Sequence, residues 1–199
     1  MWMSDKPLNQ QRLARDLADL LNVVRGTDNF LGLVDAFWKT MAREWSGIDA
    51  LRMDKFLYLV RCYVGAAFEY LSRHQWGVDG LMEQYLDMLK GVPLNAKDMK
   101  ISTGLRLHVI DLYVDELDKA DTKRDAPLEK ILAPLRQLGK DTPTKSVRSR
   151  VKEALADERL EDWQNVRSKE DAEDVEDETP GTHESRPVDS DDEFGGFDD

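Results

Sequence analysis

Residues 50–73 constrain the fold of this chain more than any other segment, because apolar side chains occur around most of the circumference when the segment is drawn as a helix. A helix apolar nearly all round must be covered by neighbours on several sides. No run alternates apolar and polar residues as a half-buried strand would. We therefore expect an all-α domain of antiparallel helix pairs in a HEAT-like or solenoid-like stack. The other segments with helical apolar spacing are residues 7–26, 28–45, 79–90, 99–120, 127–139 and 143–155.

Glycine, proline and capping residues divide this pattern into separate helices. Gly47 is expected to end one helix, and Asp49 to cap the next by accepting a hydrogen bond from its first turn. Pro134 is expected to bend the helix over residues 127–139, because proline has no N–H to donate to the preceding turn. The remaining expected breaks are Gly26, Gly91 and Gly139 as helix ends and Gly104 as an interruption.

Charge is distributed very unevenly along the chain. The net charge of the whole chain is −12, and residues 168–199 alone contain 14 acidic and 2 basic residues. Residues 1–167 carry 26 charges of each sign. A segment with few hydrophobic residues and high net charge cannot offset the entropy lost on folding. The expected organisation is a helical domain over residues 1–160 followed by a disordered acidic tail over residues 161–199.

Several classes of protein are excluded by what the sequence lacks. Cys62 is the only cysteine, so no disulfide framework or cysteine-based zinc cluster can form within the chain. No apolar run approaches the roughly 20 residues that span a bilayer, so we expect a soluble intracellular protein without a membrane partner. There is no glycine-rich phosphate loop, no nucleophile elbow and no HExxH pair. We expect no cofactor, no metal and no small-molecule substrate.

The candidate for enzyme chemistry is an acidic ridge formed by Asp111, Asp115 and Asp118 on one predicted helix. Paired carboxylates can hold Mg²⁺ or transfer protons, which would suit a nuclease. A metal-dependent nuclease usually gathers its carboxylates from separate elements into a cleft, whereas these three lie on a single helix. We therefore expect the ridge to be a solvated face or a contact for a basic partner, and the protein not to be an enzyme.

The stretch between residues 44 and 56 combines an indole, a glycine and a helix cap, and we interpret it as a tight corner between two packed helices. Trp45 closes the helix before the corner and Gly47 allows the turn. His108 lies in a broad apolar region and has no second histidine at ligand spacing, so a hydrogen-bonded structural role is expected. The residues assigned to this structural motif are Trp38, Trp45, Gly47, Asp49, Phe56 and His108.

Two sets of basic residues are candidates for binding RNA or protein partners. Residues 136–152 contain six positive charges and one negative charge, which could neutralise phosphates without reading sequence. An ordinary charged helix edge explains this set equally well. Acidic residues are interspersed in the set near the corner, which favours salt bridges. The candidates are Lys39, Arg43, Arg52, Lys55 and Arg61 near the corner, and Arg136, Lys140, Lys145, Arg148, Arg150 and Lys152 further along.

The acidic tail carries two short features of its own. Ser190 precedes Asp-Asp-Glu, a pattern typical of sites for acidophilic kinases, and phosphate there would add negative charge. Phe194 and Phe197 could anchor a short linear contact. The simpler interpretation is a solubilising tail without a specific contact.

Three stretches that follow one another along the chain resemble the ribosomal-RNA-processing protein 1 family of nucleolar proteins. They are residues 1–7, 37–56 and 104–117. The resemblance covers roughly residues 1–120. In that family the stretch Met-Trp-Met-Ser-Asp-Lys-Pro lies inside the chain, after earlier helices. We therefore expect this helical domain to lack the family's N-terminal helices.

The resemblance implies a function in the nucleus, within the nucleolus. It implies a non-enzymatic scaffold of the pre-60S particle that is needed for processing of the 27S-type precursor in its internal transcribed spacers. The expected partners are pre-rRNA and pre-60S assembly factors. The alternative is a general helical adaptor whose acidic tail chaperones basic ribosomal proteins.

Overall fold

The computed structural model describes residues 1–77 and 80–163, and within these ranges every regular element is a helix. This confirms the expected all-α fold. The elements are α1 (Pro7–Val23), α2 (Thr27–Glu44), the short 3₁₀ helix η1 (Trp45–Gly47), α3 (Ala50–Arg73), α4 (Leu81–Gly91), α5 (Thr103–Ala120), α6 (Leu128–Ile131), α7 (Ala133–Asp141) and α8 (Lys145–Leu155).

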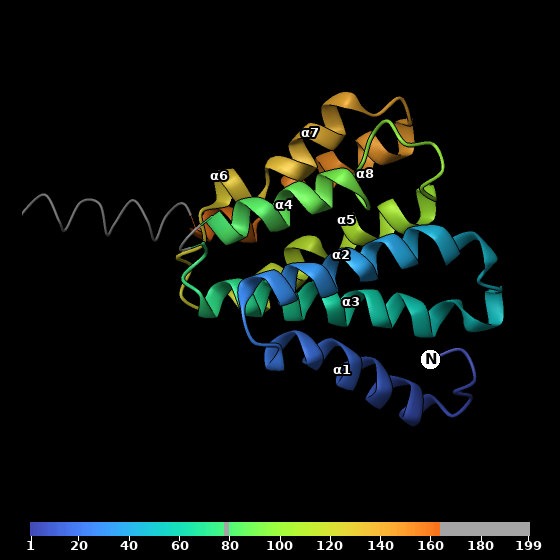
Figure 1. Cartoon of the computed structure of the whole chain (residues 1–199). Coiled ribbons are helices and arrows are strands. Elements are labelled where there is room, and N and C mark those ends of the chain that lie inside the picture. The colour runs from blue at the N-terminus through green and yellow to red at the C-terminus, as the bar shows by residue number, and fades with distance from the viewer. Residues whose placement is uncertain (78–79, 164–199) are drawn as a thin grey trace, which may run out of the picture.

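The helices pack as a stack of two rows (Figure 1). In one row α3 lies between α1 and α5, and α5 packs in turn against α8. In the other row α4 lies between α2 and α7. Helices α7 and α8 join the two rows at one end of the stack. The expected stack of antiparallel helices is therefore confirmed.

Helix α3 is the central helix, as its apolar circumference predicts. Its buried residues interlock with aromatic rings from both rows. Tyr63 stacks on Phe37 of α2 with ring centroids 3.6 Å apart, and Phe68 meets Tyr113 of α5 edge to face at 5.1 Å. Each buried aromatic side chain removes about 150–250 Å² from water, so these contacts account for much of the core. The first turn lies outside the core, where Leu51 is 97% exposed, and Glu69 and Arg73 are exposed near the other end of the helix.

Helix α5 begins at Thr103 instead of near residue 99, which corrects the predicted boundary. The Ser102 hydroxyl caps it by accepting a hydrogen bond from the backbone N–H of Gly104 at 3.2 Å. Gly104 therefore lies in the first turn and does not interrupt the helix. The start of α4 is likewise later than predicted, at Leu81, because Gly80 is left-handed with φ of 74°.

The helix predicted over residues 127–139 is divided into α6 and α7. The break falls at Leu132, two residues before Pro134, because proline cannot donate to the carbonyl four residues earlier. The predicted helix end at Gly139 is wrong, since α7 continues to Asp141. Gly139 instead allows close approach: a Cβ built there would lie 2.8 Å from Cγ1 of Val151 on α8.

Packing continues beyond residue 160, where the boundary of the helical domain was expected. Trp163 is only 1% exposed, and its indole N–H donates to the carboxylate of Asp121. The guanidinium of Arg124 lies over the same ring, 3.8 Å from its centroid. The predicted acidic tail over residues 161–199, including Ser190, lies outside the described residues from residue 164 onward.

Candidate interaction surfaces

The corner between α2 and α3 has the construction that the sequence predicts. Trp45 begins the 3₁₀ turn and is 5% exposed, and Gly47 ends that turn. The Asp49 carboxylate caps α3 by accepting from the backbone N–H of Arg52 at 3.1 Å. The same carboxylate pairs with the Arg52 guanidinium, which lowers the pKa of Asp49. The corner is therefore a rigid part of the fold.

His108 of α5 reaches the corner from the adjacent helix. Its Nε2 lies 2.9 Å from the carbonyl oxygen of Leu57, and its ring is stacked on Trp45 at 6.4 Å between centroids. Burial lowers the pKa of His108, so the neutral imidazole is the favoured form. This arrangement gives His108 the hydrogen-bonded structural role that was expected.

The two remaining residues of the structural motif differ in burial. Trp38 is 1% exposed and is one of the largest core side chains. Phe56 is half-buried, and its ring lies 6.0 Å from the ring of Trp2, whose exposed fraction is 44%. Phe56 therefore joins the N-terminal segment to α3.

The exposed cations near the corner are held in ion pairs. The Lys39 ammonium lies 2.6 Å from Asp35, and Arg43 lies 2.6 Å from Glu44. Arg52 pairs with its neighbour Asp49 and also covers the Trp2 ring at 4.7 Å. Exposed pairs of this kind contribute roughly 0–1 kcal/mol each. Their charges are compensated locally, so this set presents little net positive potential.

Lys55 is part of the fold and is not a surface cation. It is 5% exposed, and its ammonium donates to the carbonyl oxygens of Trp2 and Ser4, both at 2.8 Å. A buried ammonium needs such acceptors because an unpaired charge is strongly disfavoured away from water. The structure thus uses Lys55 to attach the N-terminal segment to α3, and the side chain is not presented to an external partner.

The acidic ridge of α5 is a seam of internal ion pairs. Asp111 accepts from Arg150 of α8 at 2.6 Å. Asp115 pairs with Arg159 at 2.9 Å and with Arg61 of α3 at 3.5 Å. Each ridge carboxylate faces at least one arginine from another segment, and the ion pairs of Asp118 are with Arg124 and Arg159. Among residues 1–77 and 80–163, no group of three His, Cys, Asp or Glu side chains could hold a metal ion.

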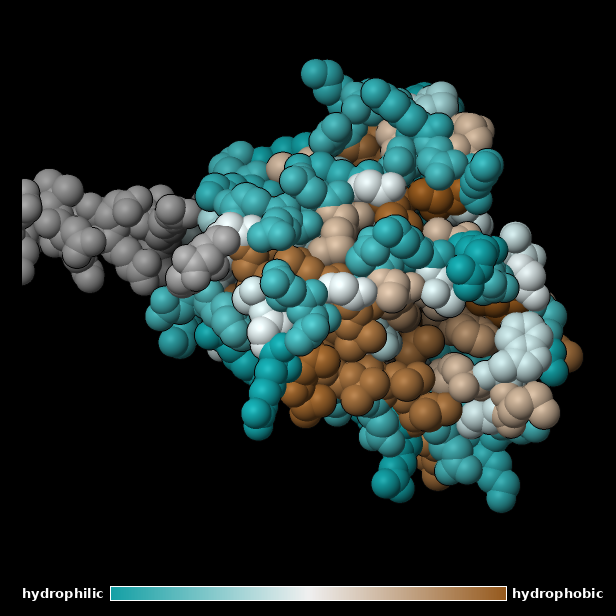
Figure 2. All heavy atoms as spheres, viewed as in Figure 1, coloured by the Kyte–Doolittle hydropathy of each residue, from teal (hydrophilic) through white to brown (hydrophobic). Residues whose placement is uncertain are grey.

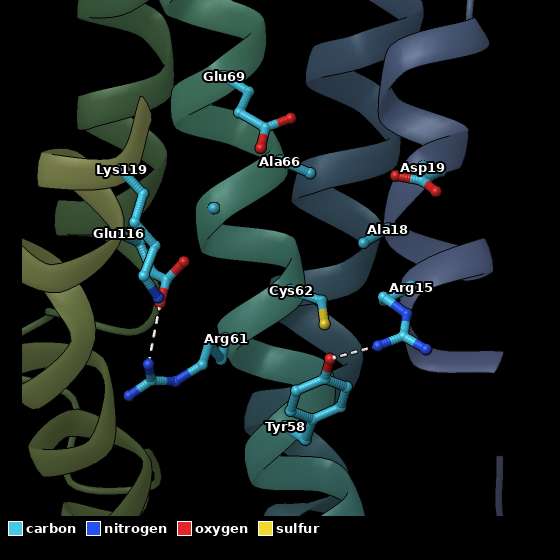
Figure 3. A pocket seen from close by; sticks show the side chains of 11 residues that line it. Arg15, Ala18, Asp19, Tyr58, Arg61, Cys62, Ala66, Glu69, Glu116 and Lys119 are labelled. Atoms are coloured by element: carbon cyan, nitrogen blue, oxygen red, sulfur yellow. Dashed lines mark hydrogen bonds and ion pairs between the residues drawn. The ribbon is translucent and has the colours of Figure 1, made fainter. Parts of the chain in front are cut away.

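A shallow cavity of about 290 Å³ opens across α3 between α1 and α5 (Figure 3). Several of its polar side chains are already paired: the Glu116 carboxylate accepts from Arg61 at 3.1 Å, and Arg15 donates to the Tyr58 hydroxyl at 3.3 Å. The Cys62 thiol also lines the cavity, and burial raises its pKa. A neutral thiol is a poor nucleophile, so the cavity has no activated group.

The second basic set lies along α7 and α8, and it contains the uncompensated charge. Two of its arginines are paired: Arg136 with Glu129, and Arg150 with Asp111. Arg148 instead donates to the backbone carbonyls of Thr142 and Pro143, at 2.9 and 2.8 Å, so its charge has no counterion there. Within the described part of the chain, no ion pair forms at the exposed side chains of Lys140, Lys145 and Lys152.

A groove of about 510 Å³ lies between α7 and α8 on this edge. Its floor comes from Gly139, Val151 and Leu155, and no carboxylate lines it. We call the four uncompensated cations and this groove the basic edge. The groove is lined by Arg136, Gly139, Arg148, Val151, Lys152, Leu155 and Ala156.

One buried polar site was missed by the sequence analysis. Asp121 is 1% exposed and accepts hydrogen bonds from the N–H groups of Asp125 and Ala126 and from the Trp163 indole. Burial raises the pKa of Asp121. Nothing in the local pattern marks this aspartate, because its partner Trp163 lies 42 residues away. It fixes the end of the described chain to the α5–α6 connection.

The face shown in Figure 2 carries an apolar area over α1 and α2. Leu20 and Val23 of α1 are 43% and 69% exposed. None of the helices within the described ranges is long and apolar enough to cross a membrane.

The fold defines the class of this protein: an all-α helical stack, which carries uncompensated cations on α7 and α8. The chain belongs to the Nop52 family of nucleolar proteins, whose family model matches residues 1–194. This confirms the expected family and the expected nucleolar localisation.

Relatives from distant organisms match a large part of the chain. It is 38% identical over 123 residues to the human ribosomal RNA processing protein 1 homolog B, covering 62% of this chain and 16% of that protein. It is 38% identical over 121 residues to the Drosophila melanogaster homolog, covering 60% and 17%. The Dictyostelium discoideum homolog is 29% identical over 177 residues, covering 78% and 36%. The matches thus span about a sixth to a third of these relatives.

Proposed function

We propose that this chain is a non-enzymatic scaffold of the nucleolar pre-60S particle and that its basic edge binds structured pre-rRNA. The observation that carries the proposal is the concentration of uncompensated cations on α7 and α8. Elsewhere in the described chain the candidate cations are paired or buried. Binding there would hold the precursor in a form that can be processed.

The chemistry of the basic edge suits an RNA backbone. Lysine ammonium groups bind phosphate as point charges, without base specificity. Double-stranded RNA is met mainly through its shape, its phosphates and its 2′-hydroxyls, because side chains cannot read its deep major groove. The edge needs no stacking aromatic residues for such contacts.

Two further observations support a scaffold in ribosome assembly. The relatives are named as ribosomal RNA processing proteins, so association with pre-rRNA and with pre-60S assembly factors is the proposed role here. The ridge carboxylates that would suit a nuclease face arginines, and these cations would compete with Mg²⁺ for the same oxygens. The adaptor alternative depends on residues 168–199, outside the described residues, and stays a prediction.

The test replaces Lys140, Lys145 and Lys152 with glutamine in the full chain and measures binding to a pre-rRNA helix at several salt concentrations. Each phosphate contact adds about 0.9 to the magnitude of the slope of the logarithm of the binding constant against the logarithm of salt concentration. We therefore expect the triple variant to bind roughly 10- to 100-fold more weakly, with a slope smaller in magnitude by about 3. The same substitution of Lys6, Lys100 and Lys123, which are exposed on other elements, is the matched control. Equal losses in both variants, or no loss in either, would refute binding at the basic edge.

A further inference from the structure

We infer that the acidic segment 189–199 of this chain docks in the groove of the basic edge and competes there with RNA. The competition with RNA rests on the proposed function, whereas the docking of the segment does not. Three observations support the docking: the charge of the groove, its apolar floor and the length of the chain that joins the segment to the core.

The first property is charge. The groove is lined by three cations and no carboxylate, and the Arg148 and Lys152 charges have no counterion within the described ranges. Three other cavities each include at least one carboxylate, such as Asp141 or Asp157. Segment 189–199 contains six acidic residues and no basic residue. Opposite charges of this size steer the two surfaces together.

The second property is an apolar floor between the cations. Val151 and Leu155 face the groove beside Gly139, which has no side chain. Its volume of about 510 Å³ falls within the range of about 300–1,000 Å³ of typical small-ligand sites. The acidic segment carries two phenyl rings, Phe194 and Phe197, separated by two glycines. A purely electrostatic contact would not need these rings, whereas an apolar floor gives them a place to be buried.

The third property is the tether. Ala156, on the rim of the groove, lies seven residues before Trp163, which is fixed in the core. Phe194 follows Trp163 by 31 residues. A random coil of this many residues has a root-mean-square extension of about 30 Å, and such a reach corresponds to an effective concentration on the order of 1 mM at a nearby site. A contact that is weak between separate molecules is therefore substantially occupied within one chain.

Occupancy of the groove would cover cations that the proposed function assigns to RNA. Phosphorylation of Ser190, immediately before the acidic run, would add about −1.5 to −2 charges and strengthen the docked state. The chain would then carry a built-in competitor that only a strong polyanion displaces.

The docking is tested in the full chain by photo-crosslinking, with p-benzoylphenylalanine in place of Phe197 and, as the matched control, in place of Val175, which is flanked by acidic residues but lies outside segment 189–199. We expect crosslinks from position 197 to map to α7 and α8 within the same molecule, and crosslinks from position 175 not to concentrate there. Crosslinks from position 197 that are absent from α7 and α8 would overturn the docking, whatever RNA does.

The competition is tested by adding a double-stranded RNA of about 20 base pairs and by the variant F194S/F197S, which keeps every charge. RNA should displace the crosslinks, and F194S/F197S should bind RNA about 3- to 10-fold more tightly, as expected for loss of an intramolecular competitor at this effective concentration. An unchanged RNA affinity would overturn the competition. Crosslinks in the groove that persist at saturating RNA would refute RNA binding at the basic edge and leave the docking in place.

Discussion

The close approach of α7 and α8 at Gly139 leads to a sharp prediction for the substitution Gly139→Ala. An added Cβ would lie 2.8 Å from Cγ1 and 3.4 Å from Cβ of Val151, whereas carbon atoms pack best at about 3.5–4.0 Å. Val151 is 3% exposed and β-branched, so its side chain has one strongly preferred rotamer in a helix and cannot turn away. The two helices must therefore separate to admit the methyl group.

Two effects of opposite sign set the magnitude. Alanine is favoured over glycine inside a helix by about 1 kcal/mol, while inserting a methyl group into a packed interface costs about 1–3 kcal/mol. Gly32 of α2 is the matched control, because a Cβ there meets nothing within 4 Å. We expect Gly32→Ala to raise the free energy of unfolding by about 0.5–1 kcal/mol. Gly139→Ala should be less stable than Gly32→Ala by about 1–3 kcal/mol.

Urea unfolding followed by circular dichroism measures the free energy of unfolding of both variants. In thermal unfolding, the same difference corresponds to a melting temperature lower by about 2–12 °C in Gly139→Ala than in Gly32→Ala. Adding Val151→Ala to Gly139→Ala should recover part of the loss, with a coupling energy of about 1–3 kcal/mol. The reasoning fails if Gly139→Ala is as stable as Gly32→Ala, or if the effects of the two substitutions at the interface are additive.

Two further predictions concern the corner and the N-terminal segment. Lys55→Met removes the ammonium that binds the carbonyls of Trp2 and Ser4, and it should lower the free energy of unfolding by about 1–3 kcal/mol. Hydrogen exchange should become faster at residues 1–6, and unchanged exchange would contradict this role. The folded-state pKa of His108 lies below its unfolded value of about 6.5, so the unfolded state binds more protons and stability falls as pH drops through 6.5. His108→Gln should lose less stability than the wild type between about pH 7.5 and 5 in urea titrations, and equal pH slopes would contradict the assignment.

Much of the fold could be predicted because it depends on local chemistry. The corner at Trp45, Gly47 and Asp49 was predicted correctly, since a cap and a turn act over a few residues. The central position of α3 followed from its apolar circumference. The break caused by Pro134 likewise needs no distant partner.

The starts of α4 and α5 were misplaced by about two to four residues for local reasons, whereas the errors about the role of a residue occurred where that residue responds to a distant neighbour. Gly139 was predicted to end a helix, but its place is decided by Val151 on the facing helix. Lys55 was assigned with the surface cations, but carbonyls more than 50 residues earlier in the chain hold it inside. Asp121 was not singled out at all, because its role depends on Trp163.

By itself, the sequence determined that this chain forms packed helices, where most of them begin and end, and to which family it belongs, because periodicity, capping and motif order are written along the chain. Only the tertiary structure decided which charges remain available to a partner. The pair between Asp111 and Arg150 joins residues 39 positions apart, and neither residue shows locally that the other will neutralise it. The basic edge exists because Lys140, Lys145 and Lys152 form no ion pair with any carboxylate among the described residues, and that follows from how the helices are stacked.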